Sequence, residues 1–346
     1  MDTQNSKMEK KHIDDVQTST VDEHLKLILK DDSINDSQED VTSNNLPHWY
    51  DKQLYKKAQN FYNQNLFSIT VAHFIGVITI FSITPILKVL LYTKQSSIPC
   101  AAAKRYIQTQ LHIHNMYISD ANKTDSKWYK SINVIRWKHK TNSEKSKNAG
   151  VGPIYQRDMV LTQLSFVAYL IMMPKCFGIR DELMEYKAFI HFWRVVGHML
   201  GIPDRLNLCR KTTAETRELC QKIIKTVFVN SLNQVSSDFD DTVSTVINSL
   251  WYVDLDLNKD YLLTLAYRIH GIEYKKPVGW YSWLIIKYND FVIKLCLIPY
   301  VGRVIKMCLN KYFAFKLFLT KNFPMLAWIK YGRDFRINLY PKYKYM

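Results

Sequence analysis

The feature that most constrains the fold is a stretch from Asn65 to Leu87 that contains no Asp, Glu, Lys or Arg. A stretch of this length can cross a lipid bilayer as a helix. A helix buried on all sides in the core of a large α-helical domain has the same composition. His73, Gly76 and several Ser and Thr residues dilute its apolar character, and Pro85 would break a helix. The stretch therefore predicts either a membrane span or a central core helix.

The rest of the composition favours an all-α fold. The chain has 346 residues, 47% of them apolar, which is enough to bury a sizeable core. Gly and Pro occur only ten times each, and long apolar runs with few breakers are typical of helices rather than turn-rich β structure. The six cysteines are scattered, without any CxxC pair. This pattern predicts reduced thiols and therefore an intracellular, reducing compartment.

Residues 1–45 form an acidic segment. They hold eight Asp, three Glu and five Lys, a net charge of −6, together with many Ser and Asn residues. Such a segment buries too little apolar area to offset the entropy lost on folding, so it is predicted to be a disordered tail. Residues 46–275 are predicted to form one α-helical domain.

Helical spacing of apolar residues places most of the helices expected in this domain. They are expected at 51–65, 101–120, 156–173 and 180–200, with two more between 213 and 252. A short helix is expected to end at His139. The Ser-, Asn- and Lys-rich residues 141–152 are expected to form a loop.

The C-terminal region, residues 276–346, is basic and rich in aromatic residues. From residue 275 onwards the chain has eleven Lys and three Arg but only two Asp, a net charge of +12. The cations alternate with apolar residues rather than forming a cluster, which suits an anionic membrane surface better than the phosphates of a nucleic acid. Nucleic acid is therefore not expected as a partner. The region predicts membrane-associating helices, and ordinary amphipathic helices with solvated lysines are the alternative.

The motifs of common enzymes are absent from the sequence. It contains no Walker loop, GxGxxG, HExxH or GxSxG pattern and no zinc spacing of Cys and His. A haem iron would need one neutral imidazole aimed from a helix into an apolar pocket. A lone histidine on an apolar helix is more often a hydrogen-bonded core residue. On these grounds no histidine stands out among the ten: His12, His24, His48, His73, His112, His114, His139, His191, His198 and His270.

Two short motifs, about thirty residues apart, carry a resemblance to a known family. Arg105 and Thr109 form an Arg-x-x-x-Thr pattern, and Arg136 and His139 form an Arg-x-x-His pattern. These motifs resemble the core of the rubber oxygenase (latex-clearing) and endoplasmic-reticulum-bound oxygenase family. Residues 156–163 (QRDMVLTQ) and 192–207 (FWRVVGHMLGIPDRLN) are also similar to that family, the second especially to its insect members. The similarity covers about residues 46–225.

The resemblance implies a fold, a cofactor and a site. The fold would be an all-α, globin-like helical bundle with additional helices, and it would hold haem b. His139 would be the iron ligand, and Arg105 and Thr109 would lie on a pocket helix near the haem or bound O₂. Gln108 stands where some rubber oxygenases have a lysine that can occupy the sixth position of the iron. With Arg136 it completes the expected cofactor-binding residues.

The resemblance also implies a reaction, the O₂-dependent cleavage or oxygenation of an apolar isoprenoid or lipid substrate. The C-terminal region would hold the enzyme at the membrane in which such substrates dissolve, the endoplasmic reticulum or another lipid surface. In this family an apolar helix equivalent to residues 66–92 lies inside the protein. For the charge-free stretch, this favours burial over a membrane span.

One departure from the family bears on catalysis. Rubber oxygenases use a carboxylate from an upstream pocket helix as a base, whereas this sequence has no Asp or Glu between Asp51 and Asp120. A base must come from elsewhere, with His73 as a candidate, or be absent. A non-catalytic, membrane-associated binding or scaffold protein that keeps the fold is therefore the alternative function.

The remaining polar residues of the 192–207 segment are expected to be structural. Trp193 lies on an apolar helical stripe and is expected to pack, and Arg194 is expected to form an ion pair. His198 is expected to be a structural histidine, and Asp204 and Asn207 are expected to form a turn.

Overall fold

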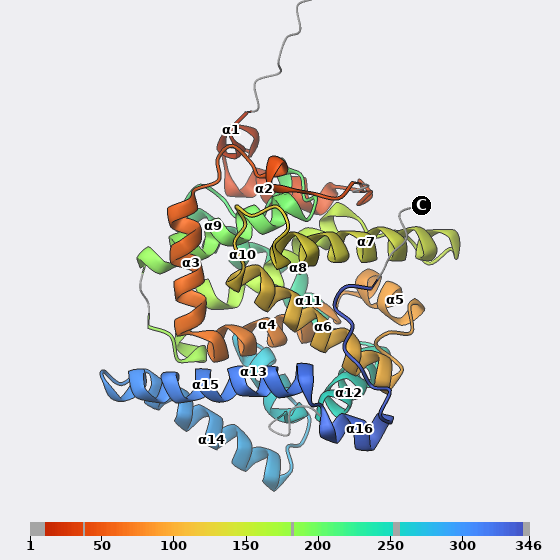
Figure 1. Cartoon of the computed structure of the whole chain (residues 1–346), viewed down its shortest axis with the longest axis vertical. Helices are drawn as coiled ribbons and strands as arrows, with labels where there is room; N and C mark the ends of the chain where they lie inside the picture. The colour runs from red at the N-terminus through yellow and green to blue at the C-terminus, as the bar shows by residue number, and fades with distance from the viewer. Residues whose placement is uncertain (1–10, 37–38, 181–182, 252–256, 342–346) are drawn as a thin grey trace, which may run out of the picture.

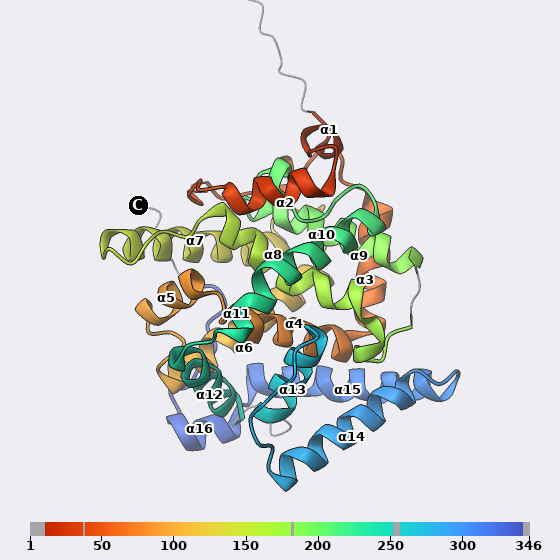
Figure 2. The ribbon, with the colours of Figure 1, turned by 180° about the vertical axis from the view of Figure 1, so that it is seen from behind.

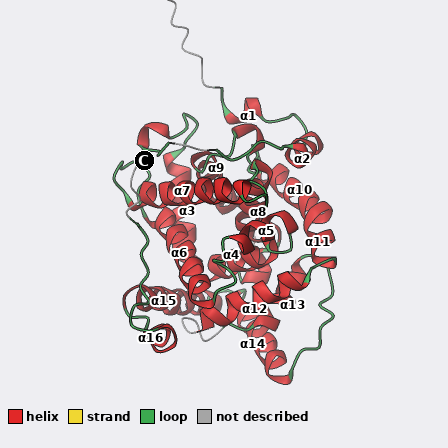
Figure 3. Ribbon diagram, turned by 90° about the vertical axis from the view of Figure 1, so that its right-hand side faces the viewer, coloured by secondary structure: helices red, strands yellow, loops and turns green. Residues whose placement is uncertain are grey.

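Helices make up nearly all of the regular structure of this chain. The computed structural model describes residues 11–36, 39–180, 183–251 and 257–341. Within these ranges there is no strand beyond one isolated bridge between Ile34 and Tyr155, and Figure 3 shows only helices and loops. The predicted all-α class is therefore confirmed. The α-helices are α1 (Ile13–Val16), α2 (Val21–Lys30), α3 (Lys52–Gln64), α4 (Leu66–Ile80), α5 (Thr84–Tyr92), α6 (Pro99–Ile118), α7 (Lys127–Asn148), α8 (Gln156–Met172), α9 (Leu183–Met199), α10 (Thr213–Ile223), α11 (Val229–Asn233), α12 (Ser237–Trp251), α13 (Lys259–Ile269), α14 (Trp280–Cys296), α15 (Val301–Asn322) and α16 (Met325–Tyr331).

Helix α4, the first part of the charge-free stretch, lies at the centre of the bundle (Figure 1). Eleven of its fifteen residues are buried, and α3, α8, α13 and α15 pack around it. The helix ends at Ile80, and α5 leaves it at an angle of 93°. No single helix among the described residues is long and apolar enough to span a bilayer, and α4 with α5 meets that requirement only as a bent pair. The charge-free stretch thus forms a helix enclosed by protein and a sharp bend, not one straight span.

Helices α4 and α8 approach each other very closely at Gly76. A Cβ atom at this position would lie 1.9 Å from the backbone oxygen of Ser165, so only glycine fits. Three residues later, the Thr79 hydroxyl lies 2.7 Å from the Tyr169 hydroxyl and adds a buried hydrogen bond. Because protein interiors are close-packed, this contact fixes the neighbouring side chains of both helices.

Helices α6 and α7 form an antiparallel hairpin that carries the two predicted motifs. The Asn115 amide of α6 lies 3.5 Å from the Ser131 hydroxyl of α7, and the Lys138 ammonium donates to the Gln108 side chain at 2.9 Å. The prediction of a loop at residues 141–152 is wrong for most of that range, because α7 continues to Asn148. No Gly or Pro occurs there before residue 150, and the low helix propensity of its polar residues is too small an effect to end a helix that is already packed.

The prediction of a disordered N-terminal tail is wrong for the part that the structure describes, residues 11–36 and 39–45. Helix α2 begins with a capping box between Thr20 and Glu23 and packs against α8 and α10, and Ile13 and Ile28 are fully buried. Four aspartates of this segment form ion pairs with the bundle: Asp14 with Arg194, Asp22 with Lys222, Asp31 with Arg205 and Asp32 with Arg157. The segment folds because a basic surface far along the chain supplies its partners. Residues 1–10 lie outside the described residues.

Helices α14 and α15 lie side by side along one edge of the bundle (Figures 1 and 2). Helix α15 packs against α4 and α3, and α14 covers part of α13 and α15. Helices α1 and α2 lie at the opposite end of the molecule (Figure 1). Helices α1 and α2 of the acidic segment and helices α14 and α15 of the basic segment therefore lie at opposite ends of the bundle.

The Gly76 contact predicts a large effect from a single methyl group. Gly76→Ala should lower the free energy of unfolding by about 1–3 kcal/mol, because the α4–α8 backbones must move apart. Urea unfolding followed by circular dichroism measures this. Gly279, which has no heavy atom within 4 Å of a Cβ position, provides the control, and Gly279→Ala should cost less. An equal loss in the two variants would contradict the role given to Gly76.

Candidate functional site

A cavity of about 250 Å³, the inner cavity, lies between α4, α5, α6, α7, α8 and α9. Most of its lining is apolar, and Phe166 of α8 and Trp193 of α9 stack on one side with ring centroids 5.1 Å apart. The lining also includes a few charged or titratable side chains: Arg105, His112, Lys138, His139 and Asp158. An apolar cavity with a small number of convergent polar groups is the usual form of a small-molecule site.

His139 extends from the middle of α7 into the inner cavity, as the resemblance implied. Its Nδ1 atom is buried and has no hydrogen-bond partner. Burial, together with the positive charges of Arg105 and Lys138, lowers the pKa of His139 to about 4. The imidazole is therefore neutral at physiological pH, which is the form that binds a metal ion.

Arg105 and Thr109 also line the inner cavity, one turn apart on α6. The Arg105 guanidinium donates to the Ser96 hydroxyl at 3.3 Å and lies over the Tyr106 ring. The Thr109 hydroxyl donates to the backbone oxygen of Arg105 at 3.0 Å, within its own helix. Three of the five predicted site residues, Arg105, Thr109 and His139, thus meet at one cavity.

Gln108 and Arg136 are not brought to the inner cavity. The Gln108 amide donates to the backbone oxygen of Asn338 at 2.8 Å and accepts from Lys138, on the outer side of α6. The Arg136 guanidinium donates to the backbone oxygens of Glu39 and Met199, and so ties the N-terminal segment and the end of α9 to α7. Both side chains connect parts of the fold in this structure.

His112 is a cavity residue that the motif comparison missed. It lies on α6 and is almost fully buried, and neither ring nitrogen has a hydrogen-bond partner. Burial lowers the pKa of His112 to about 4, with a further contribution from Lys138. A helical count from Thr109 (three residues, one turn) places it on the same face and could have identified it.

Asp158 is the second cavity residue that sequence reasoning missed. It lies in the first turn of α8, and one carboxylate oxygen accepts from the backbone N–H of Tyr155 at 3.1 Å. Burial raises the pKa of Asp158 above its usual value. It is the one carboxylate among the described residues that line the inner cavity. The QRDMVLTQ segment contained this signal, because Asp158, Thr162 and Phe166 recur every four residues on one helical face.

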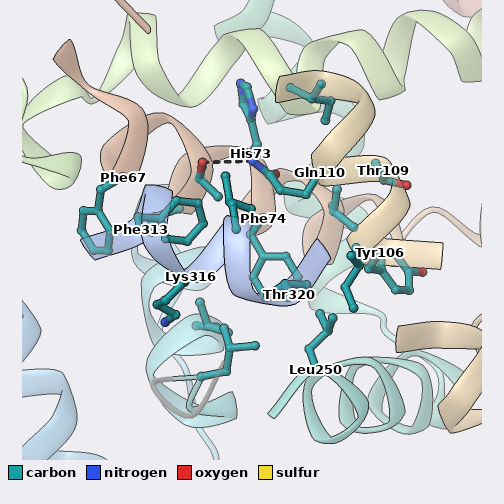
Figure 4. Close-up of a pocket in the computed structure, with 18 of the residues that line it drawn as sticks. Phe67, His73, Phe74, Tyr106, Thr109, Gln110, Leu250, Phe313, Lys316 and Thr320 are labelled. Carbon is teal, nitrogen blue, oxygen red and sulfur yellow. Dashed lines mark hydrogen bonds between the residues drawn. The ribbon is translucent and has the colours of Figure 1, made fainter. Parts of the chain in front are cut away.

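His73, the sequence-based candidate for a base, does not reach the inner cavity. It lines a second cavity of about 180 Å³, the outer cavity, between α4, α6, α13 and α15 (Figure 4). Burial lowers the pKa of His73 to about 3. A base this weak would be poorly suited to proton abstraction near neutral pH.

The 192–207 segment holds the wall of the inner cavity together. The Gln163 amide of α8 donates to the backbone oxygen of Trp193 at 2.9 Å and accepts from the backbone N–H of Leu208 at 3.1 Å. Gly197 of α9 allows α8 to approach this closely, since a Cβ atom at Gly197 would lie 2.4 Å from the Gln163 amide nitrogen. Asn207 is fully buried and donates to the backbone oxygen of Arg194.

The structural roles expected for Arg194 and His198 agree with these contacts. Arg194 pairs with Asp14, and the His198 ring lies 2.7 Å from the Asp204 carboxylate. Trp193 packs as expected but also lines the inner cavity. No group of three or more His, Cys, Asp or Glu side chains suitable for a metal ion occurs in the described ranges.

Comparison with known proteins gives a fold and a short sequence match. No family model matches the chain. The rubber oxygenase of Streptomyces sp. (strain K30) is 35% identical over 52 residues, which span 15% of this chain and 13% of that protein. The solved structure of latex clearing protein LCP in the closed state superposes with a TM-score of 0.51 at 14% identity, over 84% of this chain and 85% of that chain. The chain thus has the helical fold of latex clearing protein.

The buried histidines predict a loss of stability in acid. His73, His112 and His139 have folded pKa values of about 3 to 4 and take up protons near 6.5 only when the chain unfolds. Stability is then complete above pH 6.5 and is lost as pH falls towards 4, by about 1.4 kcal/mol per pH unit for each histidine. Urea unfolding of the wild type at pH 7.5 and at pH 5.5 should show this loss. His112→Asn should lose less stability between these two pH values than the wild type, by the contribution of one histidine. An equal loss in the variant and the wild type would contradict the role given to His112.

Proposed function

We propose that this protein is a haem b-dependent oxygenase that uses O₂ to cleave or oxygenate an apolar isoprenoid or lipid substrate. The observation that carries the proposal is His139, a neutral imidazole with an unpartnered Nδ1 atom, facing an apolar cavity within a latex-clearing-protein fold. The match to a rubber oxygenase adds weight to this assignment, although it spans a small part of both chains.

The residues present in the inner cavity fit haem. His139 would bind the iron, and the apolar side chains around it would hold the macrocycle away from water. Arg105 and Lys138 would hold the cofactor carboxylates, because two partly buried cations need negative partners and Asp158 is the single carboxylate nearby. When bound, haem would supply the iron that activates O₂.

Asp158 would act as the proton acceptor that the upstream helix lacks. Its carboxylate faces the inner cavity, and the raised pKa makes it a stronger base than an exposed aspartate. The carboxylate would accept the proton released when an allylic C–H bond of an isoprenoid is oxidised, and O₂ would accept the electrons of that bond. The Thr109 hydroxyl, held against its own helix, would orient the substrate or O₂ from the opposite side of the cavity.

An apolar lipid or isoprenoid substrate dissolves in membranes, so we expect the protein to bind a membrane surface. Eighteen of the twenty-three large apolar side chains that are exposed in the described ranges lie between Trp280 and Ile329. Exposed apolar patches of this extent are typical of surfaces that bind a partner or a membrane. We infer that α14 and α15 attach the protein to an anionic intracellular membrane, such as the endoplasmic reticulum.

Absorption spectroscopy tests the iron ligand. Wild-type protein supplied with haem should show a Soret band, and His139→Ala should lose it or shift it strongly, because the imidazole is removed. His112→Ala is a matched control, since it removes a buried histidine with a similar pKa from the same cavity. A folded wild-type protein without a Soret band would overturn the haem proposal. A band that survives in His139→Ala but not in His112→Ala would reassign the ligand.

Oxygen uptake tests the role of Asp158. With geranylgeraniol as the probe, Asp158→Asn should lower the rate about 10²–10⁴-fold. Its amide oxygen can still accept from Tyr155, so fold and Soret band should be retained. The wild-type rate should rise with pH through the raised pKa of Asp158, and this rise should vanish in the variant. An unchanged rate in Asp158→Asn would remove the residue from the mechanism. Haem-loaded wild type that consumes no O₂ with apolar probes would favour a binding protein instead.

A further inference from the structure

The outer cavity is an apolar chamber that the proposed reaction does not use. Phe67 and Phe313 lie at one end of it, and Tyr106 and Thr109 lie at the other (Figure 4). Most of its lining is apolar. Among its polar groups, the Gln110 amide donates to the Thr70 hydroxyl at 3.1 Å, and the two buried ring nitrogens of His73 have no hydrogen-bond partner. The chamber is thus suited to an apolar chain rather than to a polar metabolite.

The two cavities share a wall. Val77 of α4, Phe166 of α8, and three residues of α6 line both of them: Tyr106, Thr109 and Ile113. One layer of side chains therefore separates the outer cavity from the cavity that contains His139. Rotation of a few side chains in this layer would join the two cavities.

The outer cavity reaches the surface beside α15. Tyr312 lines the cavity and is 49% exposed, and the Lys316 ammonium lies 5.0 Å from the centre of its ring. Phe313, Leu317 and Thr320, from the inner face of the same helix, also line the cavity. The opening of the outer cavity therefore lies beside the Lys316 ammonium and the Tyr312 ring.

The outer face of α15 is also apolar. Val304, Met307, Phe315 and Phe318 recur at helical spacing on one stripe and are each half or more exposed. Helix α14 adds Trp280, which is 80% exposed, and continues the same kind of surface. Helix α15 therefore has apolar side chains on both faces, one lining the cavity and the other in contact with the surroundings.

The charges around this surface favour an anionic bilayer as the occupant. Between residues 280 and 331 the chain has eight cations, Lys287, Lys294, Arg303, Lys306, Lys311, Lys316, Lys321 and Lys330. Asp290 is the single acidic residue in this range, and it pairs with Arg268. Aromatic side chains with interspersed lysines match the boundary between anionic headgroups and acyl chains.

We propose that the outer cavity takes up the apolar chain of a lipid from a bilayer on which α14 and α15 lie. The chain passes Tyr312 and Lys316, fills the outer cavity and reaches the inner cavity through the shared wall of Tyr106, Thr109 and Ile113. The delivery to His139 rests on the proposed function, whereas uptake of a chain does not require haem.

Lipid extraction from vesicles tests the proposal. Deuterated geranylgeraniol is dissolved in vesicles of phosphatidylcholine and phosphatidylserine, the full-length protein is added and then separated from vesicles at high salt, and retained probe is measured by mass spectrometry. Wild type should retain about one probe per chain. Leu317→Trp fills the outer cavity from α15 and should reduce retention about tenfold.

Phe315→Trp is the matched control. It places the same side chain two residues away on the same helix, on the outer face, and should retain the probe as the wild type does. Val71→Phe, which fills the cavity from α4, repeats the test if Leu317→Trp does not fold. His139→Ala should extract the probe normally even when it binds no haem, so a failed haem assignment is distinguishable from a failed uptake.

The outcomes decide the two parts of the proposal separately. Normal retention by folded Leu317→Trp and Val71→Phe would overturn the outer cavity as the binding site. Absence of retention in the wild type would overturn uptake altogether. Equal extraction from pure phosphatidylcholine vesicles, or by Lys311→Glu with Lys321→Glu, would overturn the anionic bilayer as the source. Retention that falls in the cavity variants and on neutral vesicles would support the whole path.

Discussion

The contact between α4 and α8 at Gly76 is the constraint on which the rest of the structure depends. A backbone oxygen of α8 occupies the place that a side chain would take, so the two helices are locked at the shortest separation available to them. Val77 and Phe166, the neighbours of the two contact residues, form part of the wall between the cavities. The position of that wall, and hence the size of both chambers, follows from one missing methyl group.

The sequence alone was sufficient for the helical class, and the family resemblance named three residues that line the inner cavity. Arg105, Thr109 and His139 meet at the inner cavity because residues three or four apart share a face and α6 and α7 are antiparallel neighbours. Gln108 was misplaced because it is adjacent to Thr109, and adjacent positions point to different sides of a helix. Arg136 was misplaced because its guanidinium donates to the backbone oxygens of Glu39 and Met199, which are distant along the chain. The membrane-associating role of the C-terminal region remains a prediction.

What the sequence could not provide were partners distant along the chain. The composition of the acidic segment predicts disorder. In the structure, however, Asp14 pairs with Arg194 and Asp31 pairs with Arg205, each more than 170 residues away. The family resemblance gave no signal for Asp158, because it places the carboxylate on the helix upstream. In the fold, α8 faces the same cavity as α6, so a carboxylate on either helix can serve one reaction centre.

The separation of charge along the bundle has an electrical consequence. Helices α1 and α2 hold four acidic residues and two lysines, whereas residues 280–331 hold eight cations and one Asp, and these helices lie at opposite ends of the molecule (Figure 1). The end of the bundle formed by α14 and α15 is therefore more positive than the end formed by α1 and α2. In the field of a negatively charged surface such a molecule feels a torque that turns this positive end inward within about one Debye length, roughly 8–10 Å. The protein would thus be oriented before it touches the surface, with α14 and α15 facing that surface.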